Sequence, residues 1–83
     1  MTALAQQVVK LSETERQAFT DVYRFYERHH AMPNTTEAWE QCYADVKEIS
    51  DRYEGSGKAL VCSLLTALYG AIDQRCRDEA KEH

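Results

Sequence analysis

The chain has 83 residues, 43 % of them hydrophobic, and carries a formal net charge of −4 at pH 7. This length fits one domain with a small core, and the hydrophobic share is typical of a folded chain rather than a disordered one. The acidic balance argues against nucleic acid as a partner, because binding to phosphates requires clustered lysine and arginine.

The sequence also favours a cytoplasmic location. Its first residues lack the basic start and the long apolar stretch of a secretory signal. Cys42, Cys62 and Cys76 are odd in number and form no Cys-x-x-Cys pair, which fits free thiols in a reducing compartment. The longest apolar-rich stretch, residues 60–72, is shorter than the roughly 20 residues that a membrane-spanning helix requires. We therefore expect no membrane contact.

The first segment, residues 1–11, carries Leu4, Val8 and Leu11 at helical spacing. A helix of this length is marginal in water unless another element covers its apolar side. Three outcomes stay open for this segment: it docks on the domain as a short fourth helix, it swaps into a partner copy, or it frays.

The first long helix is predicted over residues 12–30. Ser12 and Glu15 form a capping box, in which each side chain accepts a hydrogen bond from the backbone amide of the other residue. Pro33 ends this helix because it cannot continue the backbone hydrogen bonds. The stripe of this helix at helical spacing consists of Phe19, Val22, Tyr23, Tyr26 and His30, widened by Phe25 and His29.

The second helix is predicted over residues 34–54, with Asn34 or Thr35 as its N-cap. It carries a coiled-coil-like seam in which apolar residues recur after three, four, three and four positions. The seam predicts a helix that packs against other helices along its length. Its members are Trp39, Cys42, Val46, Ile49 and Tyr53. Gly55-Ser56-Gly57 is predicted to end this helix and reverse the chain.

The third helix is predicted over residues 58–80. Its apolar positions, from Leu60 to Ile72, cover an arc of roughly 200°, which is wider than one neighbouring helix can cover. We therefore place it at the centre of the domain, and we expect the charged residues 78–83 to fray. Short connections favour antiparallel neighbours. The chain is predicted to be a single all-α domain over residues 1–83, an antiparallel three-helix bundle.

No motif in the sequence predicts catalysis, a cofactor or a metal. Gly55-Ser56-Gly57-Lys58 looks like the end of a phosphate-binding loop, but the first glycine and the Ser or Thr after the lysine are missing. No cysteine lies beside a histidine in the sequence, and the carboxylates lie on predicted polar faces rather than in an apolar cleft. We expect that the protein is not an enzyme and has no catalytic, cofactor-binding or metal-binding residue.

The tandem His29-His30 supports an alternative, a small ligand- or metal-binding helical bundle. Adjacent residues on a helix point about 100° apart and rarely share one metal ion. In this alternative a second subunit would have to supply further ligands, and the site would lie at a subunit boundary.

The surplus of apolar surface favours a protein partner. Exposed aromatic clusters commonly mark sites of protein–protein interaction. The competing interpretation is that the helices and the 1–11 segment cover one another fully. We expect a protein that acts by protein–protein interaction, with a homodimer as the favoured form. The interface candidates are Trp39, Tyr43, Tyr53, Leu65, Tyr69 and Ile72.

A group of packing and capping residues gives the chain a resemblance to other small helical proteins. These residues are Tyr23-Arg24-Phe25-Tyr26, the Met32-Pro33-Asn34 break, Trp39, and Tyr53 before the Gly-Ser-Gly turn. Over about residues 15–75 the chain resembles small uncharacterised helical proteins of gut Firmicutes and their mobile elements. The resemblance implies no activity, no cofactor and no catalytic residue.

Overall fold

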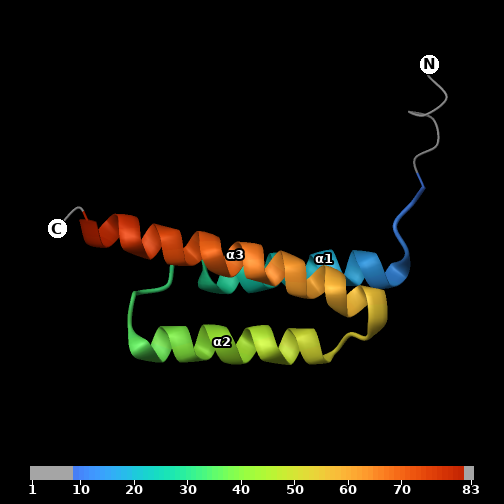
Figure 1. Ribbon diagram of the computed structural model, residues 1–83, viewed down its shortest axis with the longest axis horizontal. Helices are drawn as coiled ribbons and strands as arrows, with labels where there is room; N and C mark the ends of the chain where they lie inside the picture. Colours follow the sequence, from blue (N-terminus) through green and yellow to red (C-terminus); the bar gives the residue numbers. More distant parts are fainter. Residues whose placement is uncertain (1–8, 82–83) are drawn as a thin grey trace, which may run out of the picture.

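The computed structural model describes residues 9–81, which form three α-helices and no strand. Helix α1 spans Glu13–His29, α2 spans Thr36–Asp51 and α3 spans Gly55–Lys81. α1 and α3 run in the same direction and α2 runs the opposite way, with short connections between them (Figure 1). The predicted all-α bundle of three helices is confirmed.

Most of the predicted N-terminal segment lies outside this range. Leu4 and Val8 fall among residues 1–8, which are outside the described residues. Residues 9–12 are described and are not helical, and the side chains of Val9 and Leu11 are exposed. Helix α1 therefore begins directly at its cap.

Side-chain caps fix where α1 and α2 begin. The Ser12 hydroxyl accepts a hydrogen bond from the Glu15 amide at 3.1 Å, and the Glu15 carboxylate accepts one from the Ser12 amide at 2.8 Å. This is the predicted capping box. At α2, the Thr35 hydroxyl accepts a hydrogen bond from the Ala38 amide at 3.2 Å. Of the two predicted candidates, Thr35 is therefore the N-cap.

The glycine-rich turn is shorter than predicted. Gly55 alone adopts a positive φ, of 59°, and α3 already begins there. Gly57 lies in the first turn of α3, where a Cβ atom would come within 3.1 Å of the Thr14 methyl group of α1. Gly55 thus reverses the chain, and Gly57 lets α3 approach α1 closely.

The predicted seam of α2 forms its packing face. Cys42, Ile49 and Tyr53 are buried, and Trp39 and Val46 are half-buried against the core. Tyr53 lies just beyond the last residue of α2, in the connection to α3. The core contains Ala18, Val22, Phe25, Met32, Cys42, Ile49, Tyr53, Val61, Leu65, Ile72 and Cys76.

The buried face of α1 differs from the predicted stripe. Its buried residues are Ala18, Asp21, Val22, Phe25 and His29. Four members of the predicted stripe, Phe19, Tyr23, Tyr26 and His30, are exposed, whereas its other members are buried. The four exposed residues lie about 100° around the helix from the buried face. The sequence carries two stripes of helical spacing, and the buried one contains polar residues whose partners lie on other elements.

Helix α3 packs against both other helices, as its wide apolar arc predicted. It continues to Lys81, although residues 78–83 were predicted to fray. Cys76, near this end of the helix, is buried. Side-chain pairs four residues apart support these last turns. They join Asp73 to Arg77, Gln74 to Asp78, and Arg75 to Glu79.

The outward side of α3 is made of small side chains. Ala59, Cys62, Ser63, Thr66, Ala67, Gly70 and Ala71 are all exposed. By length and composition alone, α3 could cross a membrane: an 18-residue window has a mean hydropathy of 1.3, and 22 % of that window is buried within the molecule. The core helices of proteins that fold in water pass the same test. The absence of membrane contact stays a prediction.

Candidate functional site

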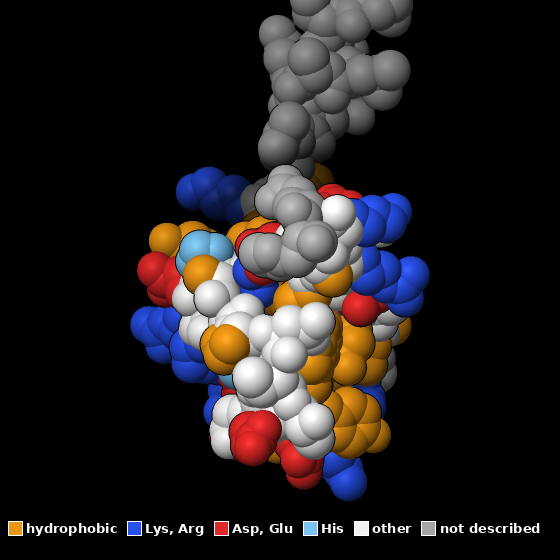
Figure 2. Space-filling model, turned by 90° about the vertical axis from the view of Figure 1, so that its left-hand side faces the viewer, with side chains coloured by type: hydrophobic (Ala, Val, Ile, Leu, Met, Phe, Trp, Pro, Cys, Tyr) orange, Lys and Arg blue, Asp and Glu red, His pale blue; other side chains and the backbone are white. Residues whose placement is uncertain are grey.

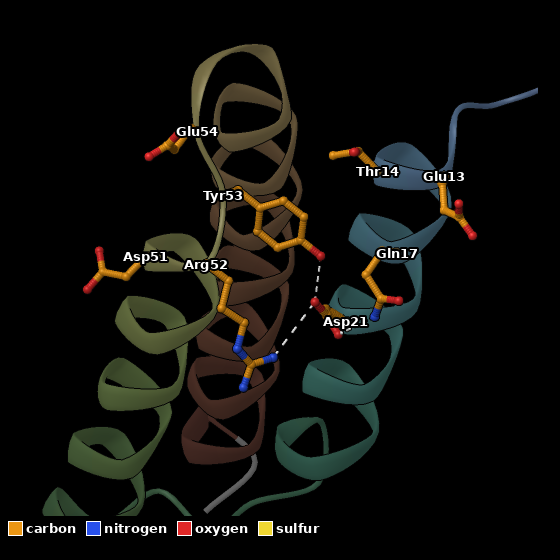
Figure 3. Close-up of a pocket in the computed structure, with 8 residues that line it drawn as sticks. All are labelled: Glu13, Thr14, Gln17, Asp21, Asp51, Arg52, Tyr53 and Glu54. Atoms are coloured by element: carbon orange, nitrogen blue, oxygen red, sulfur yellow. Dashed lines mark hydrogen bonds and ion pairs between the residues drawn. The ribbon is translucent and has the colours of Figure 1, made fainter.

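A hollow of about 750 Å³ opens between the start of α1 and the end of α2 (Figure 3). Asp21 of α1 lines it and is buried. Its Oδ2 accepts a hydrogen bond of 2.5 Å from the Tyr53 hydroxyl, and its Oδ1 accepts one of 3.1 Å from Gln17 Nε2. Arg52 Nη1 lies 3.7 Å from Oδ2 and completes an ion pair. Asp21 therefore connects α1 to the residues that follow α2.

This cluster is suited to anchoring rather than to catalysis. Burial, together with the hydrogen bond to Asp21 and its charge, raises the pKa of Tyr53 to about 12. The phenol therefore keeps its proton at neutral pH and acts as a hydrogen-bond donor. Both oxygens of Asp21 accept hydrogen bonds within this cluster. Glu13, Asp51 and Glu54 also line the hollow, but they face water rather than an apolar cleft.

A second polar cluster joins α1 to α2 near the C-terminal end of α1. Asp45 Oδ2 accepts hydrogen bonds from Arg28 Nη2 at 2.7 Å and Nε at 3.0 Å, and lies 2.8 Å from His29 Nε2. Burial tends to raise the pKa of Asp45, but the hydrogen bonds from His29 and Arg28 outweigh it and hold this pKa below its usual value. The cluster ties the inner face of α1 to α2.

The structure separates the predicted His29-His30 pair. His29 is buried, bonded to Asp45 and packed against the Phe25 ring, with 4.9 Å between the ring centroids. His30 is exposed and lies beside the Tyr26 ring, at 5.4 Å. Within residues 9–81, no three His, Cys, Asp or Glu side chains are grouped so that they could hold a metal ion.

Two of the three thiols are core residues. Cys42 and Cys76 are buried, Cys62 is exposed on α3, and all three are free. Burial, followed by the nearby charge of Asp45, raises the pKa of the Cys42 thiol to about 11. This thiol therefore stays protonated at neutral pH and is a poor nucleophile.

Three of the predicted interface residues lie at the surface between α2 and α3, and we call them the α2–α3 patch: Trp39, Tyr43 and Tyr69. The Trp39 and Tyr69 rings pack together with 5.1 Å between centroids, and the indole donates a hydrogen bond to Asn34 Oδ1 at 2.8 Å. Tyr43 is 62 % exposed and, with Trp39, lines a shallow hollow of about 450 Å³. Figure 2 views the end of the molecule where α2 begins, and hydrophobic side chains gather there among charged ones.

The other three predicted interface residues, Tyr53, Leu65 and Ile72, are buried in the core. Leu65 and Ile72 lie on the line of α3 that faces both other helices, and the Tyr53 hydroxyl points inward to Asp21. These three side chains have no surface to offer a partner. Of the six predicted interface residues, the three of the α2–α3 patch are therefore the ones that reach the surface, and the exposed aromatic side chains of α1 provide another candidate surface.

Sequence reasoning missed a second aromatic surface. It consists of Phe19, Tyr23, Tyr26 and His30, which we call the outer stripe of α1. Phe19 is 45 % exposed, Tyr23 64 % and Tyr26 39 %. A signal for it was present, because the spacing of Ala18, Val22, Phe25 and His29 fits a helix face equally well.

Comparisons with known proteins add no relative to this description. No protein-family model matches the chain, and neither a curated protein nor a solved structure matches it.

Proposed function

We propose that this protein is a non-catalytic helical module that works by binding another protein chain, with a second copy of itself as the partner. The observation that carries the proposal is the outer stripe of α1, in which three aromatic side chains on one helix face are exposed. Contiguous apolar surface on a soluble chain commonly marks an interaction site. Aromatic rings suit this role because they supply a large contact area with few rotatable bonds.

The polar clusters support the non-catalytic part of this proposal. Asp21 accepts hydrogen bonds from Gln17 and Tyr53, and one oxygen of Asp45 accepts them from Arg28 and lies beside His29. Both carboxylates join α1 to other parts of the bundle, which is a structural role. The three free cysteines fit a reducing cytoplasm, which is the location that we propose.

The ligand- or metal-binding alternative has less support. It would use His29 and His30, but His29 Nε2 is engaged by Asp45 and the two rings have different surroundings. A zinc titration tests this alternative directly. A rise in melting temperature with zinc would support it, and an unchanged melting temperature and mass would remove it.

The solution mass tests the proposed self-association. Light scattering across a tenfold concentration range should give about twice the 9.6 kDa mass of one chain at the upper concentrations. A mass of one chain throughout would contradict self-association. A capture experiment with the wild-type chain and with α1 variants would then ask whether a different protein binds.

A further inference from the structure

We propose that the shallow hollow beside Trp39 and Tyr43 binds the guanidinium group of an arginine that a partner protein presents. The inference rests on the proposed function in one respect, that the partner is a protein chain. It adds the chemistry by which that chain is recognised, and it places this recognition on the α2–α3 patch, where aromatic rings and a carboxylate lie next to one another.

The hollow has a volume of about 450 Å³ and lies at the start of α2. Trp39 and Tyr43 are four residues apart, and Glu40 lies three residues before Tyr43. Residues at these spacings are neighbours on the surface of a helix. The hollow therefore combines two aromatic rings with one carboxylate. The remaining lining residues are Asn34, Thr35 and Thr36.

Two contacts hold the indole ring of Trp39 in place before a partner binds. Its Nε1–H donates a hydrogen bond of 2.8 Å to Asn34 Oδ1, and the ring packs against Tyr69 of α3 with 5.1 Å between the centroids. A side chain that is already ordered loses little conformational entropy on binding. The face of a tryptophan ring also attracts cations more strongly than that of any other aromatic side chain.

Glu40 supplies a carboxylate that no basic side chain of residues 9–81 neutralises. It is exposed and takes part in none of the ion pairs that these residues form. Glu48 and Glu79 are exposed as well, but each is paired with an arginine four residues away. The charge of Glu40 is therefore available to a cation from another chain.

A guanidinium group is complementary to both parts of the hollow. It is planar and stacks on an aromatic face, and its N–H groups can bind a carboxylate in pairs. An apolar side chain would cover Glu40 without offering it a hydrogen bond. The amides at the start of α2 would attract an anion, but the Thr35 hydroxyl already binds one of them, and Glu37 and Glu40 would repel it.

The shape of the hollow favours an arginine that belongs to a protein chain. Sites for free small molecules enclose most of the ligand surface, whereas this hollow is shallow. Around it, the exposed ring of Tyr43 and the half-buried ring of Tyr69 give a partner chain further apolar surface to cover. Arginine and aromatic side chains are both enriched in protein–protein interfaces.

The chain has one tryptophan, so its indole N–H signal in an NMR titration reports on this hollow. The probes are two blocked tripeptides, glycyl-arginyl-glycine and glycyl-citrullyl-glycine, because citrulline keeps the shape of arginine and lacks its charge. The arginine peptide should shift the Trp39 signal until the site is saturated. The citrulline peptide should bind at least about fivefold more weakly. Equal binding of the two peptides would overturn the proposal.

Two matched pairs of variants locate the site. Glu40→Gln should weaken binding of the arginine peptide about three- to fivefold, the effect of an exposed ion pair. Glu27→Gln removes the same charge from an exposed position on α1 and should leave binding unchanged. Tyr43→Leu should weaken binding about two- to fivefold, the effect of a cation–π contact. Tyr23→Leu is its control, because Tyr23 is 64 % exposed and Tyr43 62 %.

Equal weakening by Glu27→Gln and Glu40→Gln would show a general attraction to an acidic chain and would overturn the site. Free arginine amide should bind no more tightly than the arginine peptide, and tighter binding would overturn the assignment to a protein partner. An indole signal that ignores the arginine peptide would overturn this inference whatever the solution mass. A mass of one chain with a responding indole would contradict self-association and leave the arginine site standing.

Discussion

The inner and outer faces of α1 differ in where they place polar and aromatic side chains. The inner face buries three apolar side chains together with a carboxylate, Asp21, and an imidazole, His29, whereas the outer face exposes Phe19, Tyr23 and Tyr26. Helices at a protein surface normally turn charge outward and apolar side chains inward. Both buried polar side chains of α1 have hydrogen-bond partners on other parts of the chain.

The energetics of the inner face explain why this arrangement is stable. A buried polar group is costly when it lacks hydrogen-bond partners and inexpensive when it has them. Asp21 has Gln17, Tyr53 and Arg52, and His29 has Asp45. The exposed rings of the outer face have no comparable hydrogen-bond partner within residues 9–81.

Two phenylalanines test the comparison most strongly. Phe25 is fully buried on the inner face and Phe19 is 45 % exposed on the outer face. Phe25→Ala should cost about 3–5 kcal/mol, enough to unfold a domain of this size. Phe19→Ala should cost less than about 1 kcal/mol at concentrations where the chain is monomeric. Urea unfolding followed by circular dichroism measures both, and equal costs would contradict the assignment of the two faces.

Removing the hydroxyl of Tyr53 tests whether its hydrogen bond to Asp21 stabilises the folded chain. Tyr53→Phe removes the 2.5 Å hydrogen bond and keeps the ring in the core. The loss should be about 1.5–3 kcal/mol, the range for a hydrogen bond to a charged group. Tyr43→Phe removes an exposed hydroxyl and is the control, with an expected change near zero. A Tyr53→Phe chain as stable as wild type would show that Asp21 does not depend on this bond.

Local signals in the sequence were enough to predict the helices and their starts. The Ser12–Glu15 capping box, Pro33 after α1 and the seam of α2 all depend on residues near one another in the chain. Leu65 and Ile72 were predicted to lie at an interface, but they are buried in the core. The sequence shows that α3 has a wide apolar arc, but it does not show which part of that arc the other two helices cover.

The inner face of α1 could not be predicted for a different reason. Tyr53 lies 32 residues after Asp21, and Asp45 lies 16 residues after His29. Pairs at such separations leave no local pattern in a single sequence. The predicted stripe therefore combined exposed residues, such as Phe19 and Tyr26, with buried ones, such as Val22 and Phe25.

The ion pairs of Asp45 make the attachment of α1 to α2 sensitive to acid. The folded state holds the pKa of Asp45 below its usual value of 3.8. The resulting stabilisation is complete above that value and is lost as the pH falls through the lower pKa of the folded state. Asp45→Asn should therefore be less stable than wild type at pH 7, and the difference should shrink as the pH falls below about 4.

The control for this prediction is Asp51→Asn, at an exposed position with Lys58 3.7 Å away. It should change stability little at any pH, since exposed ion pairs contribute little. Melting temperatures from pH 7 to pH 2 provide the comparison. A constant difference between Asp45→Asn and wild type across this range would show that the carboxylate charge does not hold α1 to α2.

Two glycines of α3 give the smallest and most local test, because Gly57 contacts α1 and Gly70 lies on the outward side of the helix. Gly70 is exposed within the helix, and a Cβ atom added there would meet no atom within 4 Å, so Gly70→Ala should stabilise the chain by about 0.5–1 kcal/mol. Gly57→Ala should gain less or lose stability, because its Cβ would lie 3.1 Å from the Thr14 methyl group. Thr14→Ser removes that methyl group and should restore the gain. If Gly57→Ala alone stabilises as much as Gly70→Ala, α1 and α3 are not closely packed at this end.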